Sequence, residues 1–224
     1  MVSQNPYYTL IGSLPALPTH FEEAQRVPIS RLALEERMKL LDAEAADVVR
    51  QMVDFLAWER QPLDRTDEDV CRHYGHFMQS AQDRFARRWI EEAMTLRTIV
   101  SALRRRRLGL GAPPGVGPVA DHVARNWTHP DFRLATRFPW IADVAAQLGG
   151  DAPFDLERTL LGIQWKCAKR LADQYQFTFE AVVLYLIRWE IVSRWTARDA
   201  AAGQEKFQRL VAEAMGRYAN MFEY

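Results

Sequence analysis

Apolar residues recur at spacings of three, four and seven along most of the chain, which is the pattern of helices that bury one face. The longest run follows Thr66 and contains Val70, Tyr74, Phe77, Ala81, Phe85, Trp89, Leu96, Ile99 and Leu103. One apolar face kept over about forty residues predicts a helix of ~60 Å if it is unbroken. Since this length exceeds the diameter of a compact domain, we expect one long central helix that is bent or forms the spine of an elongated protein.

Both ends of this run carry helix-boundary signals. Thr66 is a good N-cap, and Asp69 three residues later completes the spacing of a capping box. At the other end Arg104–Arg107 place cations where the helix dipole favours them, and Gly109 and Gly111 follow.

The rest of the chain is also helical in pattern. Residues 30–60 predict two helices with a break near Asp42, a candidate N-cap, and closure by Pro62. Residues 119–150 predict two short helices, and three more are expected over 153–175, 178–201 with Thr178 as cap, and 203–222. We therefore predict an all-α elongated bundle of about seven to nine helices. It forms one domain over 1–224, with the Gly/Pro linker over 109–118 as the place where a division into two lobes would fall.

The opening stretch NPYYTLIGSLPAL, residues 5–17, differs from this pattern. Residues 7–14 form the one run in which apolar and polar residues alternate as in a strand, and Pro15 and Pro18 disfavour an early helix. We expect an extended N-terminal segment.

Composition narrows the class of protein. The 224 residues are 48% hydrophobic and 26% charged, as in an ordinary globular domain, and the formal net charge of 0 gives no reason to expect nucleic acid as a partner. No apolar run approaches the ~20 residues of a membrane helix. Residues 1–17 hold no basic residue, which argues against export, and Cys71 and Cys167 make no disulfide framework. We expect a reduced, cytoplasmic protein without a transmembrane segment.

Four features of the sequence are candidates for chemistry. Cys71, His73 and His76 form C-x-H-x-x-H, but Cys71 lies well around the helix from the two histidines. Glu91 and Glu92 beside Arg87 and Arg88 have the spacing of a solvated charged face. The glycines over 109–117 lack the Gly-Lys-Ser/Thr of a phosphate loop, and Ser13 lacks the context of a nucleophile. We predict no catalytic residue, no metal and no cofactor.

The four successive arginines Arg104, Arg105, Arg106 and Arg107 require a further explanation. They point around the whole circumference of a helix, so they cannot all cap it. A solvated helix end and a docking patch for an acidic protein partner both remain open.

Two stretches resemble a known family. FEAVVLYLIRWEIVSRWTAR, residues 179–198, resembles the closing motif of the C subunit of V/A-type rotary ATPases, called d in the eukaryotic enzyme. The matching positions are Tyr185, Arg188, Glu190 and Arg194. WIEEAMTLRTIVSALRRRRLGL, residues 89–110, resembles the same family's acid-then-basic helix before a glycine. The opening YYTLIGSLPAL and the later VPIS are similar to short bacterial proteins of unassigned function that are encoded beside V/A-type ATPase subunits.

The resemblance implies a non-catalytic connector of the central stalk, which couples the soluble stalk to the membrane rotor ring during proton or sodium translocation. Its partners would be other stalk and rotor subunits, and it would be peripheral on the cytoplasmic face of the inner membrane. The N-terminal segment would pack against the first helices through Tyr7, Tyr8, Leu10, Ile11 and Leu14, with Pro15 after them. Two alternatives stay open: a small helical enzyme with Glu91, Glu92 or Glu190 as acid/base, and a generic helical adaptor.

Glu190 also carries an expectation of its own. Val182, Val183, Leu186 and Trp189 make its helix largely apolar, so its carboxylate needs a cationic partner. By spacing, Arg194 is the nearest candidate one turn on, whereas Arg188 lies on a different face.

Overall fold

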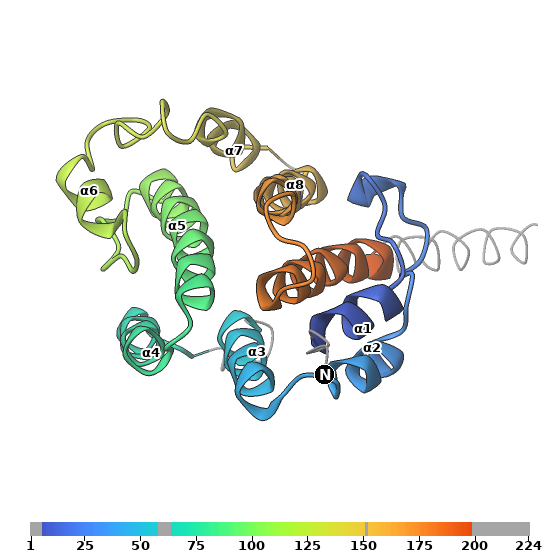
Figure 1. Cartoon of the computed structure of the whole chain (residues 1–224). Coiled ribbons are helices and arrows are strands. Elements are labelled where there is room, and N and C mark those ends of the chain that lie inside the picture. Colours follow the sequence, from blue (N-terminus) through green and yellow to red (C-terminus); the bar gives the residue numbers. More distant parts are fainter. Residues whose placement is uncertain (1–5, 58–63, 151, 199–224) are drawn as a thin grey trace, which may run out of the picture. The chain divides into compact units, whose positions relative to one another are not determined.

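The computed structural model describes residues 6–57, 64–150 and 152–198, and within these ranges every regular element is a helix. The elements are α1 (Pro6–Ser13), the 3₁₀ turn η1 (Phe21–Glu23), α2 (Arg31–Met38), α3 (Ala43–Leu56), α4 (Asp67–Ser80), α5 (Arg84–Arg107), α6 (Ala120–Arg125), α7 (Ile141–Gln147) and α8 (Pro153–Ala172). A further helix covers residues 179–198 (Figure 1). The all-α prediction is confirmed. The helix expected over 203–222 and the closure at Pro62 lie outside the described residues.

The chain divides into two compact units. Of the described residues, 6–37 and 168–198 form one unit, here called the terminal unit, and the other, the central unit, lies within Met38–Cys167. The boundaries fall near the end of α2 and inside α8. The Gly/Pro segment over 109–118 lies inside the central unit.

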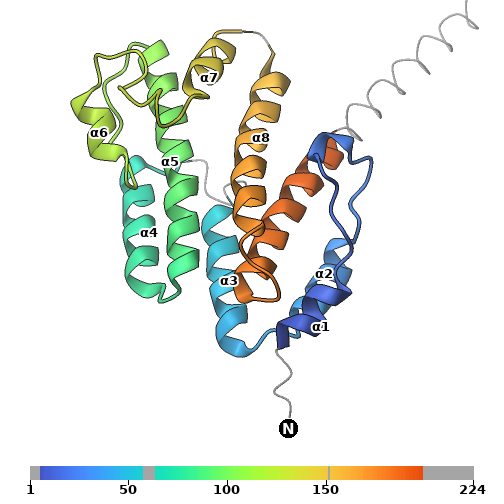
Figure 2. The ribbon, with the colours of Figure 1, turned by 45° about the horizontal axis from the view of Figure 1, so that its top comes forward.

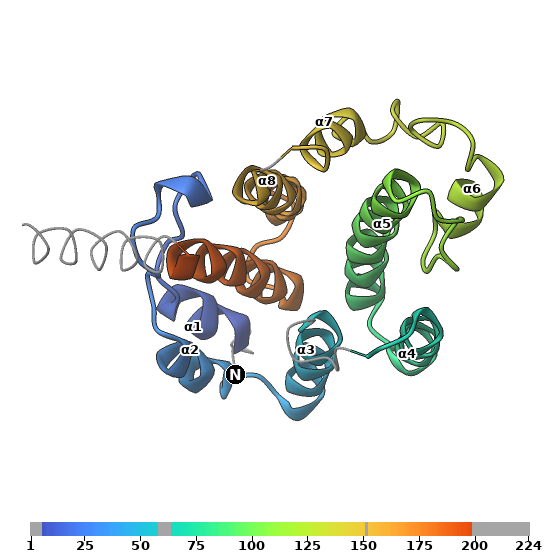
Figure 3. The ribbon, with the colours of Figure 1, turned by 180° about the vertical axis from the view of Figure 1, so that it is seen from behind.

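Helix α5 organises the central unit. It contacts α3, α6 and α7, and α3 in turn contacts α4 (Figure 3). The buried core joins the C-terminal half of α5 to the segment after it, through Leu96, Ile99, Val100, Ala102, Leu103, Val119, Val123, Phe132, Leu134, Ile141 and Val144. Leu156, Leu160 and Ile163 of α8 pack against this core. The two short helices predicted over 119–150 are thus held by burial against α5, and the prediction is confirmed.

The long helix expected from Thr66 to Leu103 is broken, so this prediction is wrong. Helix α4 ends at Ser80 and α5 begins at Arg84, because the Asp83 carboxylate accepts a hydrogen bond from the Ala86 amide and caps a new helix. Phe77, Ala81 and Phe85 keep the four-residue spacing across the break, which is why the periodicity conceals it. With 24 residues, α5 is ~36 Å long.

The predicted helix boundaries are otherwise close to the observed ones. Thr66 and Asp69 form the capping box of α4, and the Asp42 carboxylate accepts from the Ala45 amide at the start of α3. After α5, Gly109 takes φ +67°, and the amides of Gly109 and Leu110 donate back to the carbonyls of Arg106 and Arg105. This is a Schellman motif, and its left-handed position favours glycine.

The segment after α5 returns along the helix by close backbone contact. The buried Thr98 hydroxyl donates to the Val116 carbonyl at 2.6 Å. At Gly115 an added Cβ would lie 2.8 Å from the Cβ of Ala120 and 3.2 Å from Cγ2 of Thr98, so a larger residue would displace this segment. Glycine at this position allows the close packing of the segment against α5.

The terminal unit is built around the helix over 179–198, beside which α1 and α2 lie (Figure 2). This helix buries Val182, Val183, Leu184, Trp189, Ile191 and Val192, and the N-terminal part of the unit buries Leu10, Phe21, Ile29 and Leu34. Its start is capped as predicted, because the Thr178 hydroxyl accepts from the Ala181 amide at 3.4 Å.

The extended conformation expected for residues 7–14 is wrong, because α1 is helical. Pro6 occupies its first position, where the missing amide hydrogen is not needed and the fixed φ suits a helix. Tertiary burial of Leu10, 1% exposed, outweighs the strand-like alternation. Leu14 precedes Pro15, and this restricts the backbone and ends the helix at Ser13.

Candidate functional site

Three side-chain contacts tie the N-terminal segment to the helix over 179–198. The Tyr185 hydroxyl donates to the Pro15 carbonyl at 2.9 Å, and the Trp189 indole Nε1 donates to the Ile29 carbonyl at 2.9 Å. Arg31 pairs with Glu190, with 3.0 Å between NH2 and Oε2. We call these six residues the N-terminal clasp.

Spacing along the helix explains how the clasp forms. Tyr185 and Trp189 are four residues apart, so both rings face the same side and meet the same passing segment. Trp189 is 3% exposed, and its indole ring also receives the Arg31 guanidinium at 5.1 Å from the ring centroid. The clasp thereby joins Pro15 and Ile29 to a helix more than 150 residues later in the sequence, and this helix contains the motif that resembles the C/d subunit.

The contacts of the N-terminal clasp differ in how far they are exposed to solvent. Burial raises the pKa of Tyr185 to about 12, so its hydroxyl is a neutral donor at physiological pH. By contrast the Glu190 side chain is 42% exposed and that of Arg31 50%. The cationic partner that Glu190 was expected to need is present, but it is not Arg194, the candidate favoured by spacing. Its observed cationic partner, Arg31 of α2, was missed because it is distant in sequence.

The other motif residues differ in burial. Burial lowers the pKa of Arg188, and its Nε donates to the Leu184 carbonyl at 3.3 Å. Arg194 is exposed, and Tyr7 and Leu14 are half-buried.

The opening tyrosines contribute unequally to the terminal unit. Tyr8 is 57% exposed, yet its ring stacks on Phe177 with 4.2 Å between centroids. Arg37 of α2 donates through Nε to the Ser13 carbonyl at 2.8 Å and holds the end of α1.

The arginines at the end of α5 mostly bind the chain's own backbone. Arg105 Nε donates to the Gly111 carbonyl at 2.9 Å, while its NH1 lies 3.3 Å from Oδ2 of Asp67. Arg107 NH2 donates to the Gly149 carbonyl at 3.2 Å. Arg104 is exposed.

Arg106 has the largest set of contacts in this run. Its guanidinium donates to the carbonyls of Thr128, at 3.0 Å, and His129, and it lies over the Phe132 ring at 5.8 Å from the centroid. Arg105, Arg106 and Arg107 therefore hold three successive loops against one helix end. This intramolecular use was missed because carbonyl acceptors leave no signal in the sequence.

The Cys71, His73 and His76 group does not converge. The Arg65 guanidinium donates to His73 Nδ1 at 3.0 Å, and the ring packs edge-on against Phe55 at 5.2 Å. Burial, then the charges of Arg65 and His76, lower the pKa of His73. The Cys71 thiol lies 3.7 Å from the Pro114 carbonyl. Among the residues the structure describes, no three histidine, cysteine or carboxylate side chains are grouped as metal ligands would be.

The acid/base candidates do not line the cavity described next. Glu91 and Glu92 are half-buried on α5, where burial and then the Glu91 charge raise the pKa of Tyr74. A cavity of about 500 Å³ in the central unit is lined by residues of the 118–137 segment, and by none of His73, His76, Glu91, Glu92 or Glu190.

Comparison with known proteins assigns a family. The family described as Protein of unknown function (DUF2764) matches residues 21–217. The chain belongs to this family. No curated protein and no solved structure matches the chain. In the described helices, none combines the length and the apolar character needed to cross a bilayer.

Proposed function

We propose that this protein is a non-catalytic connector of the central stalk in a bacterial V/A-type rotary ATPase, with a role like that of the C/d subunit. The observation that supports the proposal is the position of the residues that resemble the C/d closing motif. Tyr185 and Glu190, which match the C/d closing motif, both belong to the N-terminal clasp. Pro15, from the opening stretch that resembles proteins encoded beside these ATPases, accepts the Tyr185 hydrogen bond.

A connector under torque needs joints that do not open, and the clasp has the properties of such a joint. Trp189 combines a buried ring with a hydrogen bond to the Ile29 carbonyl. Separating this joint would expose apolar surface and leave a polar group unpaired, and both cost free energy. In this proposal the protein is peripheral on the cytoplasmic face of the inner membrane, held there by stalk and rotor subunits.

The test is reconstitution of the host's V/A-type ATPase with and without this protein. We expect binding to the purified central-stalk subunits by titration calorimetry. In vesicles we expect ATP-driven ion transport only when the protein is present, with ATP hydrolysis continuing in its absence. Transport that is equally coupled without it would overturn the proposal, as would a failure to bind any stalk or rotor subunit.

Arg104 offers a more specific test of the docking hypothesis for the arginine run. It is exposed, and replacing it leaves intact the carbonyl contacts of Arg105, Arg106 and Arg107. We expect Arg104→Glu to weaken stalk binding and to reduce its dependence on salt, because an exposed attractive charge is screened by ions. Arg84→Glu, an exposed change at the first residue of α5, is the control. Equal binding by both variants would assign Arg104 to a solvated helix end.

A further inference from the structure

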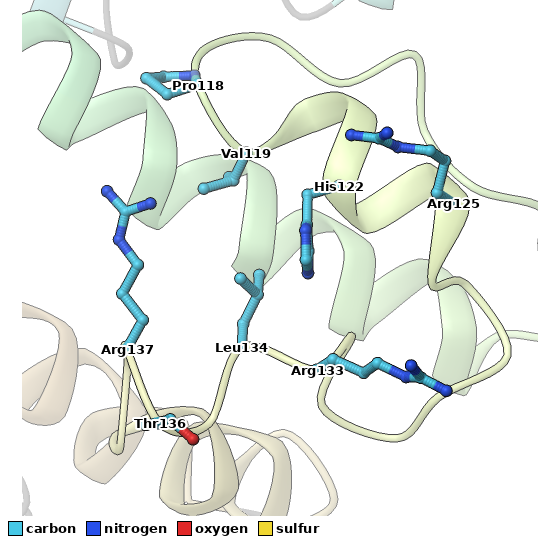
Figure 4. Close-up of a pocket in the computed structure, with 8 residues that line it drawn as sticks. All are labelled: Pro118, Val119, His122, Arg125, Arg133, Leu134, Thr136 and Arg137. Carbon is cyan, nitrogen blue, oxygen red and sulfur yellow. The ribbon is translucent and has the colours of Figure 1, made fainter.

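A second surface, on the central unit, has the features of a binding site. The cavity of about 500 Å³ is lined by Pro118, Val119, His122, Arg125, Arg133, Leu134, Thr136 and Arg137 (Figure 4). This volume lies within the range of ligand-binding clefts. Val119 and Leu134 are buried core residues, at 2% and 5% exposure, and they form an apolar floor. Thr136 and the three arginines are exposed and form a polar rim.

The rim carries positive charge that the described part of the chain does not neutralise. No carboxylate lines the cavity. In the described ranges, no ion pair joins a carboxylate to Arg125, Arg133 or Arg137. The nearby Asp131 carboxylate is engaged instead by His129 Nδ1 and by the Arg133 backbone amide, at 2.9 Å for the latter.

The segment that supplies the rim is held in an uncommon backbone conformation. Phe132 and Arg133 both take φ 56°, a left-handed conformation that non-glycine residues rarely adopt. The contacts that hold it are hydrogen bonds to the backbone. His122 Nε2 lies 3.0 Å from the Phe132 carbonyl, and Arg106 binds the carbonyls of Thr128 and His129. Arg133 is thus placed at the cavity by Arg106, which does not line the cavity, and by His122, which does.

We propose that this cavity binds an acidic segment of a partner protein, in which an apolar side chain is flanked by carboxylates. Figure 4 shows Arg137 on one side of Val119 and Leu134, and Arg125 and Arg133 on the other. A ligand that meets both sides needs negative charge on each side of an apolar group, and a peptide supplies this with alternating side chains. Guanidinium groups bind carboxylates through paired hydrogen bonds.

The experiment measures binding of a short labelled peptide with a central leucine between two pairs of glutamates to the full chain, by fluorescence anisotropy. A second peptide replaces the glutamates with glutamines. The pocket variant is Arg125→Glu with Arg137→Glu, one change on each side of the floor. The control, Arg84→Glu with Arg88→Glu, has the same change in net charge and lies on the N-terminal part of α5. Far-ultraviolet circular dichroism checks that both variants retain their helices.

We expect the glutamate peptide to bind about tenfold tighter than the glutamine peptide, and the pocket variant to lose about tenfold in affinity, as for other close charge pairs. The control variant should bind as the unaltered protein does. Equal affinity for the two peptides would overturn the proposal, as would equal losses in the two variants. Displacement of the peptide by inorganic phosphate at equal concentration would assign the cavity to a small anion and also overturn it.

Discussion

Replacing Trp189 with phenylalanine tests whether the N-terminal clasp stabilises the terminal unit. Phenylalanine keeps an aromatic ring but removes the indole N–H, so the Ile29 carbonyl loses its buried donor at 2.9 Å. An unpaired buried carbonyl costs about 1–3 kcal/mol. The smaller ring leaves a partly filled cavity where Trp189 was 3% exposed, at about 1–2 kcal/mol more. Together they predict a loss of about 2–5 kcal/mol, a large part of a typical domain's stability.

Two measurements check this prediction. Urea unfolding followed by circular dichroism should show a lower midpoint for Trp189→Phe. Limited trypsin digestion should cleave faster after the exposed Arg26, because opening of the clasp frees the segment between η1 and α2. Trp140→Phe, in the central unit, is the control and should leave cleavage at Arg26 unchanged. An unchanged urea midpoint together with an unchanged cleavage rate would refute the view that the clasp holds this segment.

Three further predictions use the same reasoning. Because the folded state keeps the Tyr185 proton to about pH 12 and the unfolded state releases it near 10.0, stability should fall as pH rises between these values, and Tyr185→Phe should reduce this fall in urea titrations. Thr98→Val removes the buried donor to the Val116 carbonyl and should lower the free energy of unfolding by about 1–3 kcal/mol, measured as a lower thermal midpoint, whereas Thr98→Ser should retain the bond. Glu190→Gln should cost less than about 1 kcal/mol in urea unfolding, because its pair with Arg31 is exposed; a loss several times larger would mean that the pair is effectively buried.

Helix boundaries were the most predictable feature of the fold. The caps at Asp42, Thr66 and Thr178 are hydrogen bonds between a side chain and an amide three residues later, so the residues that form them are adjacent in sequence. Asp83 has the same relation to Ala86 and is the local signal for the break between α4 and α5. The sustained apolar spacing from Phe77 to Phe85 hid this signal.

The candidate sites were less predictable, because the partners of each side chain lie far away in sequence. The arginine run was interpreted as a solvated end or a docking patch, yet Arg106 and Arg107 bind carbonyls 22 and 42 residues away. The cationic cavity was not foreseen. Arg125 ends α6, and Arg133 and Arg137 follow in a segment of turns held by Arg106, so helical spacing does not predict that the three line one cavity.

The sequence by itself determined the all-helical class, most helix boundaries and the buried faces, because these depend on periodicity and on hydrogen bonds within one turn. Only the tertiary structure decided that residues 7–14 are helical, since burial of Leu10 outweighs their strand-like alternation. It also decided which backbone each long side chain binds, as with Trp189 and the carbonyl of Ile29, 160 residues earlier. Every residue but proline offers the same backbone donor and acceptor, so composition and spacing cannot distinguish among these partners until the chain is folded.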